Sequence, residues 1–305
     1  MGRYITRRLI QTLFVLFVVS TFVFVLLRAI GDPARLLVSP ESSTQNIEEI
    51  RHALGLDRPL LEQYLDYMVH LLRFDFGNSF TYDRPASELI AMHIGATIQL
   101  AGAALLISVP LGIFLGCVSA IKRNSLFDNL ATFLAVFSRA IPSFWLGIMM
   151  ILVFSIQFKL LPPSGFGSPR QIIMPAVALG TSMAAIIARL TRSNMLEVLS
   201  SDYVRTARGK GAKESLVITR HALRNALLPV VTIIGLQMGN LLGGSIIIET
   251  VFAWPGIGNL LIESINEFDF PVIQATVFVI AVFFVVINLV TDFIYVVIDP
   301  RIRLS

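Results

Sequence analysis

The sequence predicts an all-α polytopic membrane protein with six transmembrane helices, both termini on the cytoplasmic side, and a helical extracytoplasmic insertion between helices 1 and 2. Three observations support this fold class. The 305 residues are 55% hydrophobic and only 14% charged, with a mean hydropathy of +0.76, whereas soluble domains carry about 25% charged residues. The chain has six long apolar stretches, and its basic residues gather in alternate loops.

Each apolar stretch is long enough to cross a bilayer, which needs roughly 20 helical residues. The first stretch follows three arginines and is similar in layout to a signal peptide. Its apolar core is longer than the roughly 7–15 residues of a cleaved signal and no A-x-A site follows, so we expect a retained anchor. The six predicted spans are Leu9–Leu27, Thr97–Ile121, Leu130–Phe154, Ile172–Leu190, Leu227–Val251 and Gln274–Ile298.

The distribution of charge predicts the topology. Basic residues accumulate in cytoplasmic loops, and six spans place these residues together on one side: Arg3, Arg7, Arg8, Lys122, Arg123, the cluster at 203–215, Arg301 and Arg303. The loop between Val251 and Gln274 has no basic residue and carries Glu263, Glu267 and Asp269. The net charge of +4 and pI near 9.5 therefore reflect membrane topology and give no reason to expect a nucleic-acid partner.

Three regions follow from this topology. Residues 1–30 form a cytoplasmic tail and the first helix, residues 31–96 form an extracytoplasmic cap, and residues 97–305 form the membrane core with spans two to six. The cap contains two amphipathic runs, NIEEIRHALGL and LLEQYLDYMVHLLRF, whose apolar spacing predicts helices. The cap can pack on the membrane core, dock an external partner, or do both.

Catalytic and metal-binding chemistry finds no support in the sequence. The four histidines are scattered without ligand spacing, the single Cys117 lies in an apolar run, and no G-x-S-x-G or H-E-x-x-H motif is present. We therefore expect no enzymatic activity, no metal and no cofactor. Helix breakers within the spans, such as Pro110, Pro142 and Pro175, and the run MGNLLGGS are typical of close helix packing in membranes.

The stretch YVRTARGKGAKES, residues 203–215, combines glycine with lysine and invites comparison with a phosphate-binding loop. The Walker A pattern requires a second glycine five residues after the first, followed by lysine and a hydroxyl residue. Gly209 is followed at that distance by Glu214, and Lys210 is followed by Gly211, so the pattern fails. The flanking spacing predicts a helix, a turn at the two glycines and a second helix leading to Pro229, within a cytoplasmic loop over 192–228.

This loop and several other motifs resemble one known family. YVRTARGKG followed by HALRNALLPV is similar to the cytoplasmic EAA loop of permease subunits in binding-protein-dependent ABC importers. The dipeptide/oligopeptide/nickel branch matches best, and GDPARLL and LLGGSIIIE favour its glutathione-type members. Motifs in family order cover nearly the whole chain, among them RRLIQTLFVLF, LGLDRPLLEQY, DFGNS, LTRSNMLEVLSSDY, FAWPGIGNLL, DFPVIQA and DPRIR.

The resemblance implies that this loop is the contact with a separate ATPase subunit. The contact residues carried over are Tyr203, Arg205, Thr206, Ala207, Lys210 and Gly211. Arg205-Thr206-Ala207 replaces the family-wide Glu-Ala-Ala, and Gly209 stands where alanine is frequent. Residues 97–305 would then be the permease core, and ATP would be bound by the partner subunits.

The implied function is that of a permease subunit in the bacterial inner membrane, forming half of the pathway of an ATP-driven importer for peptides or related small solutes. Glutathione or a nickel chelate is the alternative substrate. The implied partners are a homologous permease, two ATP-binding subunits, an extracytoplasmic substrate-binding protein and the lipid bilayer. A self-contained secondary transporter is the first rival, but it would need several buried acids and an inverted repeat, and only Asp292 qualifies. A membrane scaffold or receptor subunit without transport is the second rival.

Polar groups inside predicted spans are candidates for the translocation pathway. Arg139, followed by Pro142, lies within the third span, and Asn240 lies in the fifth. Arg139 can face the pathway and meet a substrate carboxylate, pair with an acid such as Asp292, or reach the cytoplasmic surface. Arg189 and Arg192 are expected to be ordinary anchors at the cytoplasmic end of the fourth span.

Overall fold

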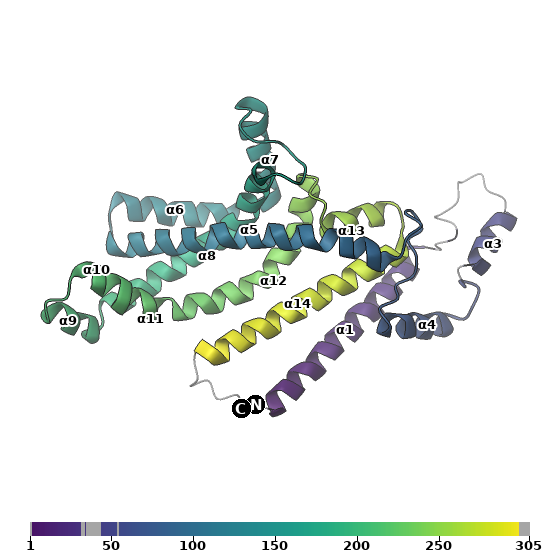
Figure 1. The fold of residues 1–305 in the computed structure, drawn as a ribbon, viewed down its shortest axis with the longest axis horizontal. Coiled ribbons are helices and arrows are strands. Elements are labelled where there is room, and N and C mark those ends of the chain that lie inside the picture. The colour runs from purple at the N-terminus through teal and green to yellow at the C-terminus, as the bar shows by residue number, and fades with distance from the viewer. Residues whose placement is uncertain (1, 32–33, 35–43, 54, 299–305) are drawn as a thin grey trace. The chain divides into compact units, whose positions relative to one another are not determined.

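The computed structural model describes residues 2–31, 34, 44–53 and 55–298, and it is helical almost throughout (Figure 1). Within these residues the only β feature is an isolated bridge between Asn78 and Pro85. The helices are α1 (Gly2–Ile30), α3 (Thr44–Ala53), α4 (Leu60–Leu72), α5 (Ala86–Ile121), α6 (Leu126–Ala140), α7 (Ser143–Met150), α8 (Pro169–Leu199), α9 (Asp202–Gly209), α10 (Glu214–Leu216), α11 (Arg224–Ala226), α12 (Leu228–Val251), α13 (Ile257–Asn266) and α14 (Phe270–Ile298). Two π-helical segments, η1 (Ile151–Gln157) and η2 (Val217–Leu223), follow α7 and α10.

Four helices are long and apolar enough to cross a membrane: α1, α5, α8 and α14. Up to two more spans arise if each of two bent helix pairs counts as one. Within the described residues, four to six candidate spans are therefore present by length and composition. The helical runs predicted in the cap correspond to α3 and α4, although part of the first run, including Leu54, lies outside the described residues.

The third predicted span, Leu130–Phe154, is not one continuous helix. It divides into α6 and the α7–η1 segment, which meet at an angle of 104°. Ile141, between them, has an extended backbone (φ −89°, ψ 122°) because the ring of Pro142 disfavours a helical conformation in the residue before it. The second bend, of 48°, lies between residues 214–226 and 228–239, close to Pro229.

The chain divides into two compact units, one with Met1–Gly95 and Gly256–Val285, the other with Ala96–Pro255 and Val286–Arg303. Helix α8 lies at the centre of the second unit and packs against α6, α7 and α12. Its fully buried Met174 and Ile187 belong to one apolar core with Ile248, Phe252 and Trp254.

Small residues allow α5 to approach α8 closely. A Cβ atom at Gly116 would come within 2.4 Å of the Ala188 carbonyl oxygen, and one at Gly112 within 2.7 Å of the Ile187 side chain. Close helix contact through small residues is the packing mode expected in membranes. In MGNLLGGS the glycines make less close helix contacts. A Cβ atom at Gly244 would lie 3.2 Å from the Leu179 side chain, and one at Gly243 would meet nothing within 4 Å.

The first unit has its own core, formed by the start of α5, by α13 and by the start of α14. The buried Asp269, just before α14, accepts a hydrogen bond from the Ser79 hydroxyl and another from the Thr81 amide at 3.3 Å. Two motifs far apart in the chain, DFGNS and DFPVIQA, therefore meet at this carboxylate. Helix α4 lies beside the C-terminal part of α1 (Figure 1).

Candidate functional site

The candidate site is the segment that connects α8 to α12. Helix α8 continues nine residues beyond the predicted span, to Leu199, and α9 begins at Asp202 after the extended residue Ser201. Asp202 in the first turn and Arg208 in the last turn of α9 complement the helix dipole. The Thr206 hydroxyl donates a hydrogen bond to the Asp202 carbonyl oxygen at 2.9 Å. This short helix corresponds to the first helix that the sequence predicts in the loop over 192–228, and its coupling role stays a prediction.

The turn after α9 depends on glycine, as predicted. Gly209 is the last residue of the helix. Gly211 adopts φ +78°, a backbone conformation that residues with a Cβ atom rarely adopt. The Gly211 amide donates to the Arg208 carbonyl oxygen at 2.9 Å. The Arg208 guanidinium then makes two bonds to the Glu214 carboxylate, of 3.1 and 2.7 Å. This carboxylate raises the pKa of Arg208, and the pair closes the turn onto α10.

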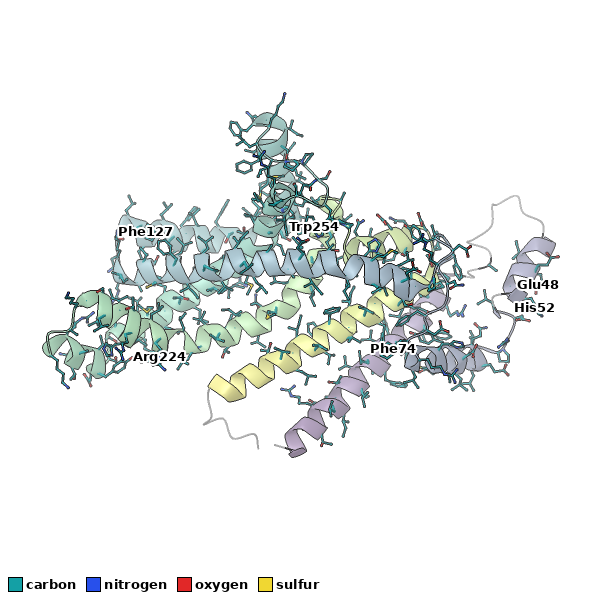
Figure 2. The ribbon with its side chains drawn as sticks, in the orientation of Figure 1. Glu48, His52, Phe74, Phe127, Arg224 and Trp254 are labelled. Atoms are coloured by element: carbon teal, nitrogen blue, oxygen red, sulfur yellow. The ribbon has the colours of Figure 1, made fainter. Side chains whose placement is uncertain are left out.

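The returning segment holds α9 in place. The Asn225 amide donates to the Tyr203 hydroxyl at 2.8 Å, and this hydroxyl donates to the His221 carbonyl oxygen at 3.4 Å. Val204 and Val217 are fully buried. The buried Ala120, Met195, Ala222 and Ala226 form one apolar cluster. The connecting segment is thus fixed to the ends of α5 and α8; Arg224, labelled in Figure 2, marks the start of α11 within it.

The outward face of α9 and its turn is open. Tyr203 is 45% exposed, Arg205, Thr206, Lys210 and Gly211 are exposed, and Ala207 is half-buried. A Cβ atom built at Gly209 or Gly211 would meet no atom within 4 Å. The predicted loop residues therefore lie close together, on a surface that the described part of the chain leaves uncovered.

Arg192 is an ion-pair partner, and the expectation that it is an ordinary anchor was wrong. Its guanidinium binds the Asp128 carboxylate through two contacts, Nε–Oδ1 at 2.6 Å and Nη2–Oδ2 at 2.8 Å. Asp128 is only 1% exposed and also accepts a hydrogen bond from the Asn124 amide at 2.9 Å. The spacing of Ser125 and Asp128 signals only the start of α6, where the Ser125 hydroxyl accepts from the Asp128 amide as an N-cap, and it gives no sign of the pairing with Arg192.

A second buried polar group, Glu249 in α12, was not singled out from the sequence. It has no exposed surface and accepts a hydrogen bond from the Thr97 hydroxyl at 2.7 Å. Five residues later the indole of Trp254 donates to the Ala96 carbonyl oxygen at 2.8 Å. These bonds join the end of α12 and the residues after it to the same turn of α5.

The predicted pathway residues are placed as follows. Arg139 is exposed in the last turn of α6, and Pro142 is exposed just before α7, so the two flank the 104° bend. Asn240 lies in α12 and Asp292 in α14, but their side chains are outside the described residues. A common site formed by Arg139, Pro142 and Asn240 stays a prediction. Within the described part of the chain, no group of His, Cys, Asp and Glu is suited to a metal ion.

Comparison with known proteins supplies the family. The model of the binding-protein-dependent transport system inner membrane component matches residues 108–304, and the model of its N-terminal region matches residues 1–101. The chain belongs to this family. It is therefore an inner-membrane permease of an ABC importer, a transport protein and not an enzyme, and the resemblance seen in the sequence is confirmed.

Individual relatives match over the whole chain. The glutathione transport system permease protein GsiC of Salmonella typhimurium (strain LT2) and that of Escherichia coli (strain K12) are each 43% identical over 304 residues, covering 99% of both chains. Two solved structures share the fold at 17% identity. An amino acid ABC transporter has a TM-score of 0.51, covering 71% of this chain and 95% of that one, and the MetNI methionine ABC transporter has a TM-score of 0.56, covering 69% and 96%.

Proposed function

We propose that the chain forms half of the translocation pathway of an ATP-driven importer for peptides or related small solutes, and that residues 203–215 couple it to separate ATPase subunits. The observation that supports the coupling role most directly is the uncovered, rigidly held face of α9. Membership of the permease family supports the class of activity, which is solute import.

The geometry supports a mechanical role for this loop. Small residues at the turn allow a partner backbone to come close, and the cationic rim of Arg205, Lys210 and Lys213 suits an acidic partner surface. The loop is held by the Tyr203–Asn225 bond and by the apolar cluster around Met195, so a push on α9 is passed to the ends of α8 and α12. Rigid-body movement of these helices would alternate access to the pathway.

The remaining components follow from the same proposal. The chain would work with a homologous permease, two ATP-binding subunits and an extracytoplasmic binding protein. Nucleotide would be bound by those ATPases, since the loop at 203–215 lacks the phosphate-loop spacing, and the chain itself would need no cofactor. The bent pair of α6 and α7–η1 would count as one span and α12 as another, giving six with both termini in the cytoplasm.

Glutathione is the specific substrate that one observation favours. Full-length relatives at 43% identity carry the name glutathione transport permease. Glutathione is itself a small peptide, so this candidate is a narrower form of the peptide proposal. Nickel chelates remain the alternative within the same mechanism.

Uptake in a strain that lacks this chain tests the proposal. Labelled glutathione, a dipeptide and a nickel–histidine chelate are offered separately to the deletion strain and to the complemented strain. We expect complementation to restore energy-dependent uptake of glutathione or the dipeptide. Restored uptake of the nickel chelate alone would overturn the peptide assignment, and no restored uptake of any of them would contradict the wider substrate class.

A further inference from the structure

Helix α4 is attached to the membrane-spanning helix α1 through aromatic side chains. The Tyr64 and Thr21 hydroxyls share a hydrogen bond of 2.7 Å. The rings of Tyr64 and Tyr67 lie 5.4 and 5.5 Å from the ring of Phe24, which is only 5% exposed. The position of α4 along α1 is therefore defined by side-chain contacts.

These contacts place α4 near one end of the α1 span. The candidate span runs over Thr6–Ile30, and Phe24 lies six residues before its end, a distance of about 9 Å along the helix axis. The Arg28 guanidinium, one turn nearer that end, lies 5.2 Å from the centre of the Phe24 ring. A helix fixed at this level lies where the hydrocarbon gives way to the lipid headgroups.

The circumference of α4 has three different faces. At about 100° per residue, Tyr64, Tyr67 and Leu71 point in one direction, toward α1. Roughly 100° further round, Leu61, Leu65 and Leu72 form a leucine face that is 69%, 55% and 81% exposed. Another step of roughly 100° brings the charged face, which contains Glu62 and Asp66.

We propose that α4 lies in the plane of the membrane as an interfacial helix, with its leucine face inserted into the hydrocarbon of the adjacent leaflet. One face then contacts α1, the second contacts lipid and the third contacts water. The aromatic, leucine and charged faces follow one another around α4 in this same order. Helix α1 also has exposed apolar side chains at the level of these contacts, where Phe22 is 63% and Val25 57% exposed. Lipid is the occupant that both surfaces share.

The charges of α4 define how the helix would bind. Its exposed polar face carries Glu62 and Asp66, and Asp66 lies 3.6 Å from His70 and 3.9 Å from Arg58. Interfacial helices that depend on anionic lipids are rich in lysine and arginine, and α4 is not. We therefore expect insertion to depend on apolar burial and on the attachment to α1, and to be the same in neutral and in anionic bilayers.

This proposal requires α1 to be a membrane span, but it does not depend on the substrate or on the coupling role of residues 203–215. Its consequence is positional: the helix would hold the segment between α1 and α5 at the membrane surface. The rival is coverage of the leucine face by a partner subunit, and it is an outcome of the test.

Spin labels on the assembled transporter in lipid nanodiscs test the proposal. The natural Cys117 is replaced by serine, and single labels are introduced at Leu65→Cys, Leu72→Cys and, as the matched control on the charged face, Asp66→Cys. The two readouts are collision with oxygen, which concentrates in lipid, and with a water-soluble nickel chelate. Each variant is used only if it retains ATP-dependent uptake, and Leu61→Cys replaces any leucine-face variant that does not.

We expect oxygen collision to exceed nickel collision at residues 65 and 72, and the order to reverse at residue 66, in both phosphatidylcholine and phosphatidylglycerol nanodiscs. Dominant nickel collision at residue 65 would mean that the leucine face lies in water and would overturn the proposal. Protection of residue 65 from both reagents would mean that a protein surface covers it, which would also overturn the proposal.

Discussion

Arg192 and Asp128 form a two-point ion pair that joins α8 to the start of α6. The carboxylate is almost fully buried, whereas the guanidinium side chain remains 28% exposed. The pair lies one to two turns before the end of α8, from which the candidate coupling segment projects. It therefore connects α6 to the helix that leads into that segment.

Removing the cation should be costly for the folded state. In Arg192→Ala the Asp128 carboxylate would stay buried without its partner, and such losses are typically about 3–5 kcal/mol. We expect the lower end of that range, because Arg192 is partly exposed. Thermal unfolding of the purified protein should show a clearly lower Tm than wild type. Arg189→Ala, one turn earlier on α8 and exposed, is the control and should leave the Tm unchanged.

The two-point geometry of this ion pair gives a second prediction, which concerns the chemistry of the side chain at residue 192. Arg192→Lys keeps the charge but cannot make both contacts at once, so the loss should be intermediate. Asp128→Asn should destabilise as well, since it leaves the guanidinium without a carboxylate. Equal Tm values for wild type, Arg192→Ala and Asp128→Asn would show that the pair does not stabilise the fold.

A bulky side chain on the coupling turn should separate ATP hydrolysis from uptake. Gly211→Trp would fill the open surface, but it would also strain a backbone at φ +78°. Gly209→Trp adds the same bulk at a position whose φ is not positive and where an added Cβ meets no atom within 4 Å, so it tests bulk without backbone strain. Gly211→Asn adds little bulk and can adopt the positive φ, so it tests the change of residue without bulk. In proteoliposomes we expect uptake per ATP hydrolysed to fall to near background in both Trp variants and to stay near normal in Gly211→Asn.

The membrane insertion of these glycine variants should be intact, because a Cβ atom at either position meets no atom of the chain within 4 Å and both positions are exposed. Amounts of protein in the membrane fraction check this point. Normal coupling in Gly209→Trp and Gly211→Trp would remove the contact role from residues 209–211.

The Tyr203 hydroxyl should contribute to the rigidity of α9. Tyr203→Phe removes the bond from Asn225 while keeping the ring, and a net loss of about 1 kcal/mol is expected for a typical hydrogen bond. Hydrogen exchange of the backbone amides in α9 and η2 should become faster by roughly fivefold, the equivalent of that energy. Thr219→Val, in η2, removes a hydroxyl that donates to the Ser215 carbonyl four residues earlier and not to α9, so it should leave α9 unaffected.

Arg139 provides a test of substrate recognition. If it meets a substrate carboxylate, Arg139→Ala should lower uptake of free-acid peptides more than uptake of the same peptides with an amidated C-terminus. Arg123→Ala, which is exposed in the turn before α6, should lower neither. Equal losses for the two kinds of peptide would argue against carboxylate recognition by Arg139.

The sequence alone determined the helical membrane class, the long apolar helices and the glycine turn after α9. These features depend on neighbouring residues, because a helix in lipid must satisfy its backbone hydrogen bonds within its own segment. The same locality explains why the end of α9 at Gly209 and the positive φ of Gly211 could be predicted.

Only the tertiary structure decided the long-range pairs and the path of the third span. Arg192 and Asp128 are 64 residues apart, and Thr97 and Glu249 are 152 apart, so no local spacing could bring them together. The 104° bend at Pro142 depends on packing as well as on proline, since α5 and α8 run continuously through Pro110 and Pro175. Which proline bends a helix is decided by the contacts available to each side of the break, and those contacts come from distant parts of the chain.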